Sequence, residues 1–260
     1  MIRTLLALLI SLPAFGQVRM STLVVKPKEV YELKGTDILV VDTLILMDSA
    51  TLVLNKLKTE NFIHVKKLVF YRGSSIDGKG VHGISGRTGR PGPSSSAPCS
   101  NGGAGLQGTE GTNGGNGISL FLSFQDIVVH GIPTIDISGG DAGDGGKGGI
   151  GGGGGSGTRL CAGGSGGVGG PGSNGGNGGN AGTLTFQAKR IPELRSMLGD
   201  RIIVRNYGGN PGAGGEGGGG GYAGLNAAGK SSLDGKSGRK GQRGKDGKSG
   251  KPGAIVFLDK

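Results

Sequence analysis

Short apolar runs separated by polar residues fill the chain between residues 38 and 71. These runs are residues 38–41, 44–47, 52–54, 62–65 and 68–71. Short runs that are rich in β-branched and apolar residues and end at polar breaks predict β-strands. The runs that begin at Leu44 and Leu68 are each followed by a serine-containing turn and another short apolar run. This recurrence predicts successive coils of a parallel β-solenoid in residues 17–78.

Similar apolar runs return at intervals through the rest of the chain, residues 79–260. We expect β-strands in three later regions, residues 117–138, 182–207 and 253–260. Within the second region, residues 191–198 predict one or two helical turns, with Pro192 near the start. The later strands are interleaved with segments of a very different composition.

Glycine occupies every third position in six segments between these strand regions. The segments form three pairs: 80–92 with 102–117, 140–155 with 163–178, and 209–224 with 235–253. A period of three is the repeat of the polyproline II backbone, and glycine at that period leaves one side of each segment free of side chains. We therefore expect three Gly-rich hairpins, spanning residues 80–117, 139–182 and 208–253.

This pattern of Gly-x-y runs resembles that of the polyglycine II bundle proteins, such as the Gly-rich antifreeze proteins of springtails and the receptor-binding tips of T-even phage tail fibres. The resemblance covers roughly half of the chain. It implies antiparallel helices packed through backbone N–H···O=C and Cα–H···O contacts. We therefore expect a mainly β fold in which a parallel β-solenoid base extrudes three hairpins that form a six-helix antiparallel polyglycine II bundle.

The high glycine content leaves two other interpretations open. Glycine supplies 63 of 260 residues, which indicates low complexity where no period is present. A small β domain with flexible linkers is one alternative, but a strand run at every segment boundary argues against it. A collagen-like trimer is the other, because residues 244–253 are collagen-like in isolation. Short runs that are poor in proline favour folding back over a triple helix.

The N-terminus has the features of a secretory signal peptide in residues 1–16. Arg3 precedes the apolar stretch 5–12, and Ala14 and Gly16 supply a small-x-small cleavage site. The apolar stretch is too short to span a bilayer, and the sequence has no other transmembrane candidate. We expect an exported protein that resides in the extracellular space, on the cell surface or in the periplasm.

The two cysteines lie where the first two hairpins turn. Cys99 falls between the members of the first pair of segments, and Cys161 between those of the second. Two cysteines suit an oxidising compartment. We expect a disulfide that joins the two tips, and closing a loop of about 60 residues would contribute roughly 4 kcal/mol.

Positive charge is concentrated in the sixth segment. The chain has a net charge of +11, and the sixth segment carries seven cations against a single acid, Asp246. The seven are Lys236, Arg239, Lys240, Arg243, Lys245, Lys248 and Lys251. They are candidates for binding an anionic ligand such as an acidic glycan or another envelope component, or they simply keep the surface solvated. The segment lacks aromatic residues for base stacking, which argues against nucleic acid.

Asparagines also recur every third residue at the end of the fourth segment and just beyond it. Asn174, Asn177 and Asn180 could form a hydrogen-bonded ladder of side chains, or they simply suit a tightly packed segment.

The sequence offers no catalytic, cofactor or metal site. Its three histidines do not stand in a known catalytic spacing, and no two carboxylates form an evident acid–base pair. Asp136, Asp141 and Asp144 lack the alternating apolar residue of Ca²⁺-binding glycine repeats. We therefore expect a protein that is not an enzyme.

The tips of the hairpins are the best candidates for a binding function. Residues 93–101, 156–162 and 225–234 vary in sequence, whereas the segments that carry them are constrained. Variable loops on a rigid scaffold are typical of recognition. We expect a secreted or cell-surface adhesion or recognition module, and a protein partner is compatible with that role. The alternative is a structural subunit of an envelope or extracellular assembly that has no specific ligand.

Overall fold

The computed structural model describes residues 18–226 and 233–259. The predicted signal peptide and the middle of the third predicted tip lie outside the described residues. Within them the fold is mainly β, with one short helix, α1 (Ile191–Met197). This helix begins with proline in its first turn, as expected from Pro192. None of the helices in the described ranges is long and apolar enough to cross a membrane.

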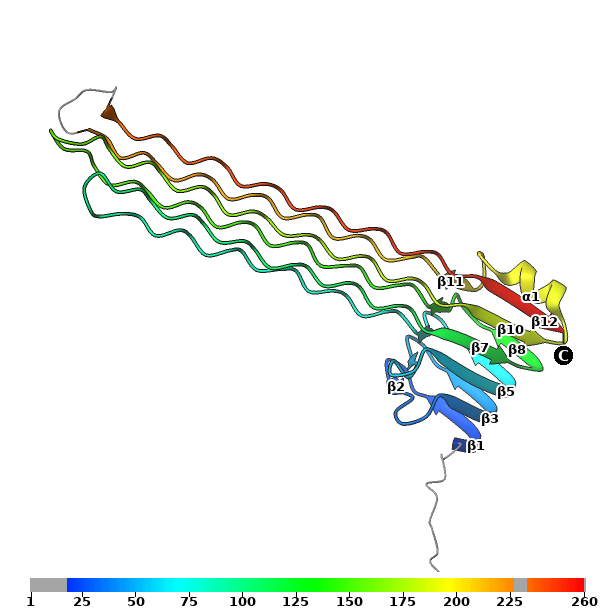
Figure 1. Cartoon of the computed structure of the whole chain (residues 1–260). Coiled ribbons are helices and arrows are strands. Elements are labelled where there is room, and N and C mark those ends of the chain that lie inside the picture. Colours follow the sequence, from blue (N-terminus) through cyan, green and yellow to red (C-terminus); the bar gives the residue numbers. More distant parts are fainter. Residues whose placement is uncertain (1–17, 227–232, 260) are drawn as a thin grey trace, which may run out of the picture.

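Two sheets of parallel strands form the base of the molecule (Figure 1). The larger sheet has the order β1 (Val18–Val25), β3 (Ile38–Leu46), β5 (Glu60–Phe70), β7 (Ser119–Ser123), β10 (Leu184–Ala188) and β12 (Ile255–Asp259), with β8 (Asp126–Val129) also beside β5. The smaller sheet contains β2 (Val30–Glu32), β4 (Thr51–Val53), β6 (Ser75–Asp77), β9 (Thr134–Asp136) and β11 (Ile203–Arg205). The chain passes from one sheet to the other and back, so each strand pairs with one from an adjacent circuit.

The register agrees with the spacing of the apolar runs. Leu44 on β3 lies beside Leu68 on β5, the two residues at which the recurring runs begin. The runs expected as separate strands at 38–41 and 44–47 form the single strand β3. Asp42, between those runs, is exposed and pairs with Lys66 on β5 at 2.9 Å, so the polar break does not interrupt the strand.

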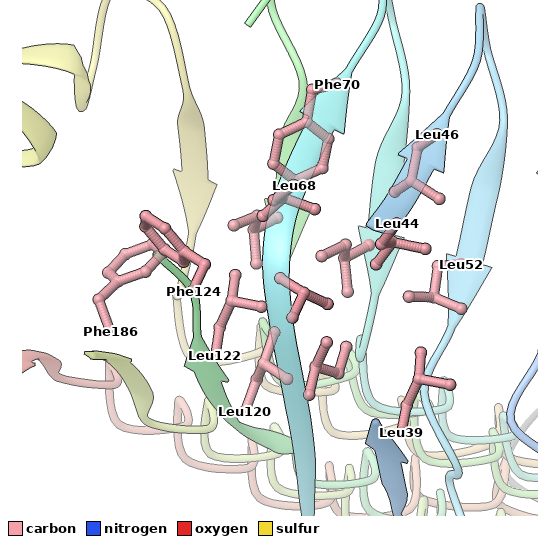
Figure 2. Close-up of a cluster of buried hydrophobic side chains, with 14 of the residues drawn as sticks. Leu39, Leu44, Leu46, Leu52, Leu68, Phe70, Leu120, Leu122, Phe124 and Phe186 are labelled. Atoms are coloured by element: carbon pink, nitrogen blue, oxygen red, sulfur yellow. The ribbon is translucent and has the colours of Figure 1, made fainter. Parts of the chain in front are cut away.

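The hydrophobic core lies between the two sheets. Figure 2 shows leucines from β3, β4, β5 and β7 directed toward one another, with Phe124 and Phe186 at one end of the cluster. These two rings meet edge to face, with centroids 6.3 Å apart. Fully burying one such side chain contributes about 1.5–3 kcal/mol, so this core holds the base together.

The six Gly-rich segments continue the two sheets outward as one long arm (Figure 1). The outbound segments, residues 80–92, 140–155 and 209–224, follow strands β6, β9 and β11 of the smaller sheet. The return segments, residues 102–117, 163–178 and 235–253, lead into β7, β10 and β12 of the larger sheet. We call the six together the Gly-rich arm. Its two layers are therefore extensions of the two sheets.

Backbone hydrogen bonds join the segments within each layer and between the layers. Within the outbound layer the segments run parallel: Gly83 N donates to Asp141 O at 2.7 Å, and Gly86 N to Asp144 O at 2.7 Å. Between the layers they run antiparallel, and Gly146 N donates to Thr109 O at 2.9 Å. Hairpin partners thus alternate in direction as expected, whereas segments in one layer share a direction.

The central position of the third and fourth segments follows from their glycine content. Each is bonded to four neighbouring segments, whereas the first and sixth are each bonded to two. Gly151 shows why a side chain is excluded there. A Cβ on Gly151 would overlap the carbonyl oxygen of Gly167 and lie 2.8 Å from the amide nitrogen of Gly221. Segments with glycine on two faces can therefore be enclosed by others.

Candidate functional site

The first two tips and the described part of the third lie together at the end of the arm farthest from the sheets (Figure 1). The first tip contacts the second through Cys99 N, which donates to Ser156 O at 2.9 Å. The third adjoins the second because Gly157 N donates to Leu225 O at 2.9 Å. The described parts of the three tips thus form one continuous surface.

Covalent and polar links fix the second tip to both neighbours. Cys99 and Cys161 form the expected disulfide, with Cα atoms 6.0 Å apart. On the other side, Asn226 of the third tip is buried, and its side-chain Nδ2 donates to Thr158 O at 3.0 Å. Thr158 N in turn donates to Cys161 O at 2.9 Å, which closes the turn of the second tip. The relative positions of the tips are therefore constrained.

Several large apolar side chains are exposed at this end of the arm. Leu160 is 97% exposed, Tyr222 is 87% exposed and Leu225 is 68% exposed. Leu160 lies in the turn of the second tip, and Leu225 contacts that tip through its backbone carbonyl. A contiguous exposed apolar patch is characteristic of interaction sites. Exposed apolar side chains also occur elsewhere on the molecule, for example at Leu57 and Ile150. Sequence inspection selected these tips for their variability but did not identify the apolar residues.

The seven predicted cations of the sixth segment are exposed but do not share one face. The backbone carbonyls of Lys236, Arg239, Lys245, Lys248 and Lys251 accept bonds from the fourth segment, so these residues lie along the seam between the two return segments. Lys240 and Arg243 stand in the other repeat position. Arg243 pairs there with Asp246 at 2.8 Å, and its Nε donates to Gly214 O of the fifth segment at 3.4 Å. Five of the seven cations therefore form a single column.

The asparagines of the fourth segment bond to the neighbouring backbone and not to one another. The Oδ1 atoms of Asn174, Asn177 and Asn180 accept bonds from the backbone N–H groups of Lys245, Lys248 and Lys251, at 2.9, 2.8 and 2.9 Å. These amide groups thus join the fourth segment to the sixth. The spacing of three placed them on one face, but their partners depend on which segment lies alongside.

The aspartates near the start of the third segment have the same role in the outbound layer. Asp141 Oδ1 accepts from Asn210 N at 2.7 Å, and Asp144 Oδ1 accepts from Ala213 N at 2.8 Å. In the part of the chain that the structure describes, no three His, Cys, Asp or Glu side chains are grouped so as to hold a metal ion. The aspartates are thus committed to joining segments.

Comparison with known proteins gives little that bears on these surfaces. No family model matches the chain, and no curated protein matches it. Among solved structures, the chain is similar to the springtail antifreeze protein from Granisotoma rainieri, which is described as a nine polyproline type II helical bundle. The identity is 26%, over 61% of this chain and 93% of that chain, with a TM-score of 0.10. A TM-score this low does not indicate a common arrangement in space.

Proposed function

We propose that the protein is an exported, non-enzymatic recognition module that binds its partner with the tips of a rigid Gly-rich arm. In this proposal the arm is a bundle of six polyglycine II helices on a β-solenoid base. The observation that carries the functional part is the exposure of Leu160, Tyr222 and Leu225 at the end of the arm where the tips adjoin. Alternative roles as a structural subunit or a collagen-like trimer predict different results below.

The period of the hydrogen bonds supports the polyglycine II assignment. Gly143, Gly146 and Gly149 donate in turn to the carbonyl groups of Thr112, Thr109 and Leu106, at 3.0, 2.9 and 2.8 Å. A bond at every third residue to the same neighbour requires about three residues per turn, which is the geometry of this helix. At a rise of about 3.1 Å per residue, segments of this length extend roughly 40–60 Å.

The fixed geometry of the tips supports recognition over a passive spacer. Ordering a flexible loop on binding costs free energy, and a pre-ordered loop avoids much of that cost. Here the Cys99–Cys161 disulfide and the buried Asn226 hold the first two tips and the described part of the third in place before any partner binds. A disulfide suits an oxidising compartment, in agreement with the signal peptide that the sequence predicts. Anchored tips with exposed apolar side chains are suited to contact another surface.

The test compares two variants that each replace three exposed apolar side chains by serine. The tip variant carries Leu160→Ser and Leu225→Ser in the second and third tips, together with Tyr222→Ser at the end of the fifth segment next to the third tip. The control carries Ile150→Ser, Val168→Ser and Leu106→Ser, on the flanks of the arm, where these side chains are 58%, 50% and 57% exposed. Fluorescent beads coated with each protein are applied to cells of the producing organism and to its extracellular matrix. Both variants are first checked for an unchanged melting temperature.

We expect the wild type and the flank variant to adhere equally and the tip variant to adhere at least about tenfold less, because burying each lost side chain is worth about 1.5–3 kcal/mol. Equal adhesion of all three proteins would reject the tips as the binding site. Sedimentation of the same samples separates the alternatives. A recognition module is expected as a monomer, a collagen-like protein as a trimer, and a structural subunit as larger assemblies that adhere to nothing.

A further inference from the structure

The outer face of the return segments carries two rows of hydrogen-bond donors beside the sheets. Three adjacent return segments contribute one residue each to a row. The first row consists of Asn113, Asn177 and Lys248, and the second of Asn116, Asn180 and Lys251. All six side chains are exposed. At about 3.1 Å per residue, the two rows lie about 9 Å apart along the arm.

Hydrogen bonds to the backbone set the direction of the asparagine amides. Asn113 Oδ1 accepts from Asn177 N at 2.7 Å, and Asn116 Oδ1 accepts from Asn180 N at 2.9 Å. Asn177 and Asn180 accept from the sixth segment in the same way. With each amide oxygen committed to the protein, each Nδ2 presents two donors to solvent. None of these four nitrogens has an acceptor among the residues that the structure describes.

On the side toward the tips, the row next to this donor face contains a carboxylate. In the next row, Asn174 Nδ2 donates to Glu110 Oε1 at 3.3 Å, so that row contains an acceptor with negative charge. The two rows therefore combine lysine ammonium groups with outward amide N–H groups and contain no carboxylate. Hydrogen bonds from charged donors to anionic oxygen atoms are stronger than those between neutral groups, so this combination favours an anionic ligand.

A cleft of about 360 Å³ adjoins the second row where the arm meets the sheets. One wall includes Asn116 and Asn180, and the other includes Lys56 and Lys58 of the loop before β5. Lys56 pairs with Asp77 at 3.0 Å. Lys58 is exposed, and within the described ranges it forms no ion pair. An anion in this cleft would thus meet amide donors on one side and the Lys58 ammonium group on the other.

We propose that the cleft and the two donor rows bind an acidic polysaccharide. A carboxylate or sulfate group occupies the cleft between Lys58 and the amides of Asn116 and Asn180, and the polymer continues across the rows past Lys251 and Lys248. A polymer is favoured because the donors repeat at a regular interval. The rows and the cleft lack an aromatic residue for stacking a base, which favours a polysaccharide over nucleic acid. The site is remote from the tips and does not depend on their function.

The substitutions Asn116→Asp and Asn180→Asp test the site with little change in shape. Aspartate retains an oxygen that accepts the backbone N–H of the adjacent segment, but it replaces the outward donor with a charged acceptor. The matched control is Gln242→Glu with Asn210→Asp, which alters net charge equally. Gln242 is exposed in the sixth segment outside the two rows, with its backbone O accepting from Gly172 N at 2.8 Å, and Asn210 lies in the outbound layer. A third variant, Lys58→Gln, tests the opposite wall of the cleft.

Biolayer interferometry measures the dissociation constants for two immobilised polysaccharides at two salt concentrations. Alginate is the carboxylated probe, and heparin is the sulfated probe. Double-stranded DNA and phosphatidylglycerol vesicles are measured in parallel. We expect at least one polysaccharide to bind, with about tenfold or greater weakening in the Asn116→Asp/Asn180→Asp variant and in Lys58→Gln. The control should change affinity less than about twofold, and the tip variant described above should bind as the wild type does.

Three results would overturn the proposal. One is failure of both polysaccharides to bind the wild type. A second is equal weakening by the control and the site variants, which would show that net charge alone governs binding. The third is binding of DNA or vesicles with the same affinity and the same dependence on Asn116, Asn180 and Lys58. Preference for alginate or for heparin identifies the anionic group.

Discussion

A single methyl group at Gly151 should disrupt the centre of the Gly-rich arm. Gly221 N donates to Gly167 O at 2.8 Å, which joins the fifth segment to the fourth. The Cβ of Gly151→Ala would overlap that carbonyl oxygen and lie 2.8 Å from that nitrogen, so the methyl group would enter the bond itself. The bond from Gly151 N to Gly219 O, at 2.9 Å, would be displaced as well.

These contacts give the magnitude of the effect. Two backbone hydrogen bonds contribute about 1 kcal/mol each, and forcing an extra carbon into a packed interior costs about 1–3 kcal/mol. The expected loss of unfolding free energy is therefore about 3 kcal/mol or more. For a chain of this size, 1 kcal/mol corresponds to roughly 2–4 °C. The melting temperature should fall by at least about 6 °C.

Gly153→Ala is the matched control in the same segment. The nearest atom to its Cβ would be Ser94 Oγ at 3.6 Å, an ordinary contact. Alanine restricts the unfolded chain, so this variant should be unchanged or more stable by about 0.4–1 kcal/mol. Differential scanning calorimetry with the disulfide intact compares the three proteins at one scan rate. Equal melting temperatures for Gly151→Ala and Gly153→Ala would refute the close packing of the segments.

Two further predictions concern the cross-link and the hydrogen-bond period. Replacing Cys99 and Cys161 by alanine should lower the unfolding free energy by up to roughly 4 kcal/mol, because the bridge spans 62 residues. In calorimetry, a reductant should lower the melting temperature of the wild type but leave that of the double variant unchanged. Protection of the backbone amides from hydrogen exchange should repeat every three residues. Gly148 N and Gly149 N donate to Glu216 O and Leu106 O and should be protected, whereas Lys147 N has no acceptor among the described residues and should exchange fast. Uniformly fast exchange would show that the segment is not hydrogen-bonded to its neighbours.

The sequence predicted the parallel strands because apolar runs are a local signal, and it predicted the disulfide because the chain has two cysteines and each lies where a hairpin turns. The apolar runs at Leu44 and Leu68 mark equivalent points of two circuits, and the structure pairs them. Strands β1 and β2 were not predicted individually. In β1, buried Leu23 and Val25 alternate with the exposed Thr22 and Val24, a pattern that could have identified the strand. Strand β2 has only three residues and no fully buried side chain, so its sequence signal is weak.

The candidate sites were harder to predict because their residues come from different hairpins. Asn116 and Asn180 lie 64 residues apart, and they meet only because the intervening chain brings adjacent circuits into register. Their donor face depends on that register, which a single segment does not encode. The sequence identified all seven cations of the sixth segment as one group. The structure places five of them along the fourth segment, whereas Arg243 donates to Gly214 O of the fifth segment, a neighbour that the sequence of one segment does not reveal.

The continuity of the arm with the two sheets has a consequence for how such a protein can change in length. Removing or duplicating one Gly-x-y triplet in each segment would leave every glycine facing a neighbour and every strand in its original pairing. A change of one or two residues in a single segment would instead rotate side chains into the interior. Evolution can thus adjust the reach of the molecule in increments of about 9 Å while the hydrophobic core stays the same.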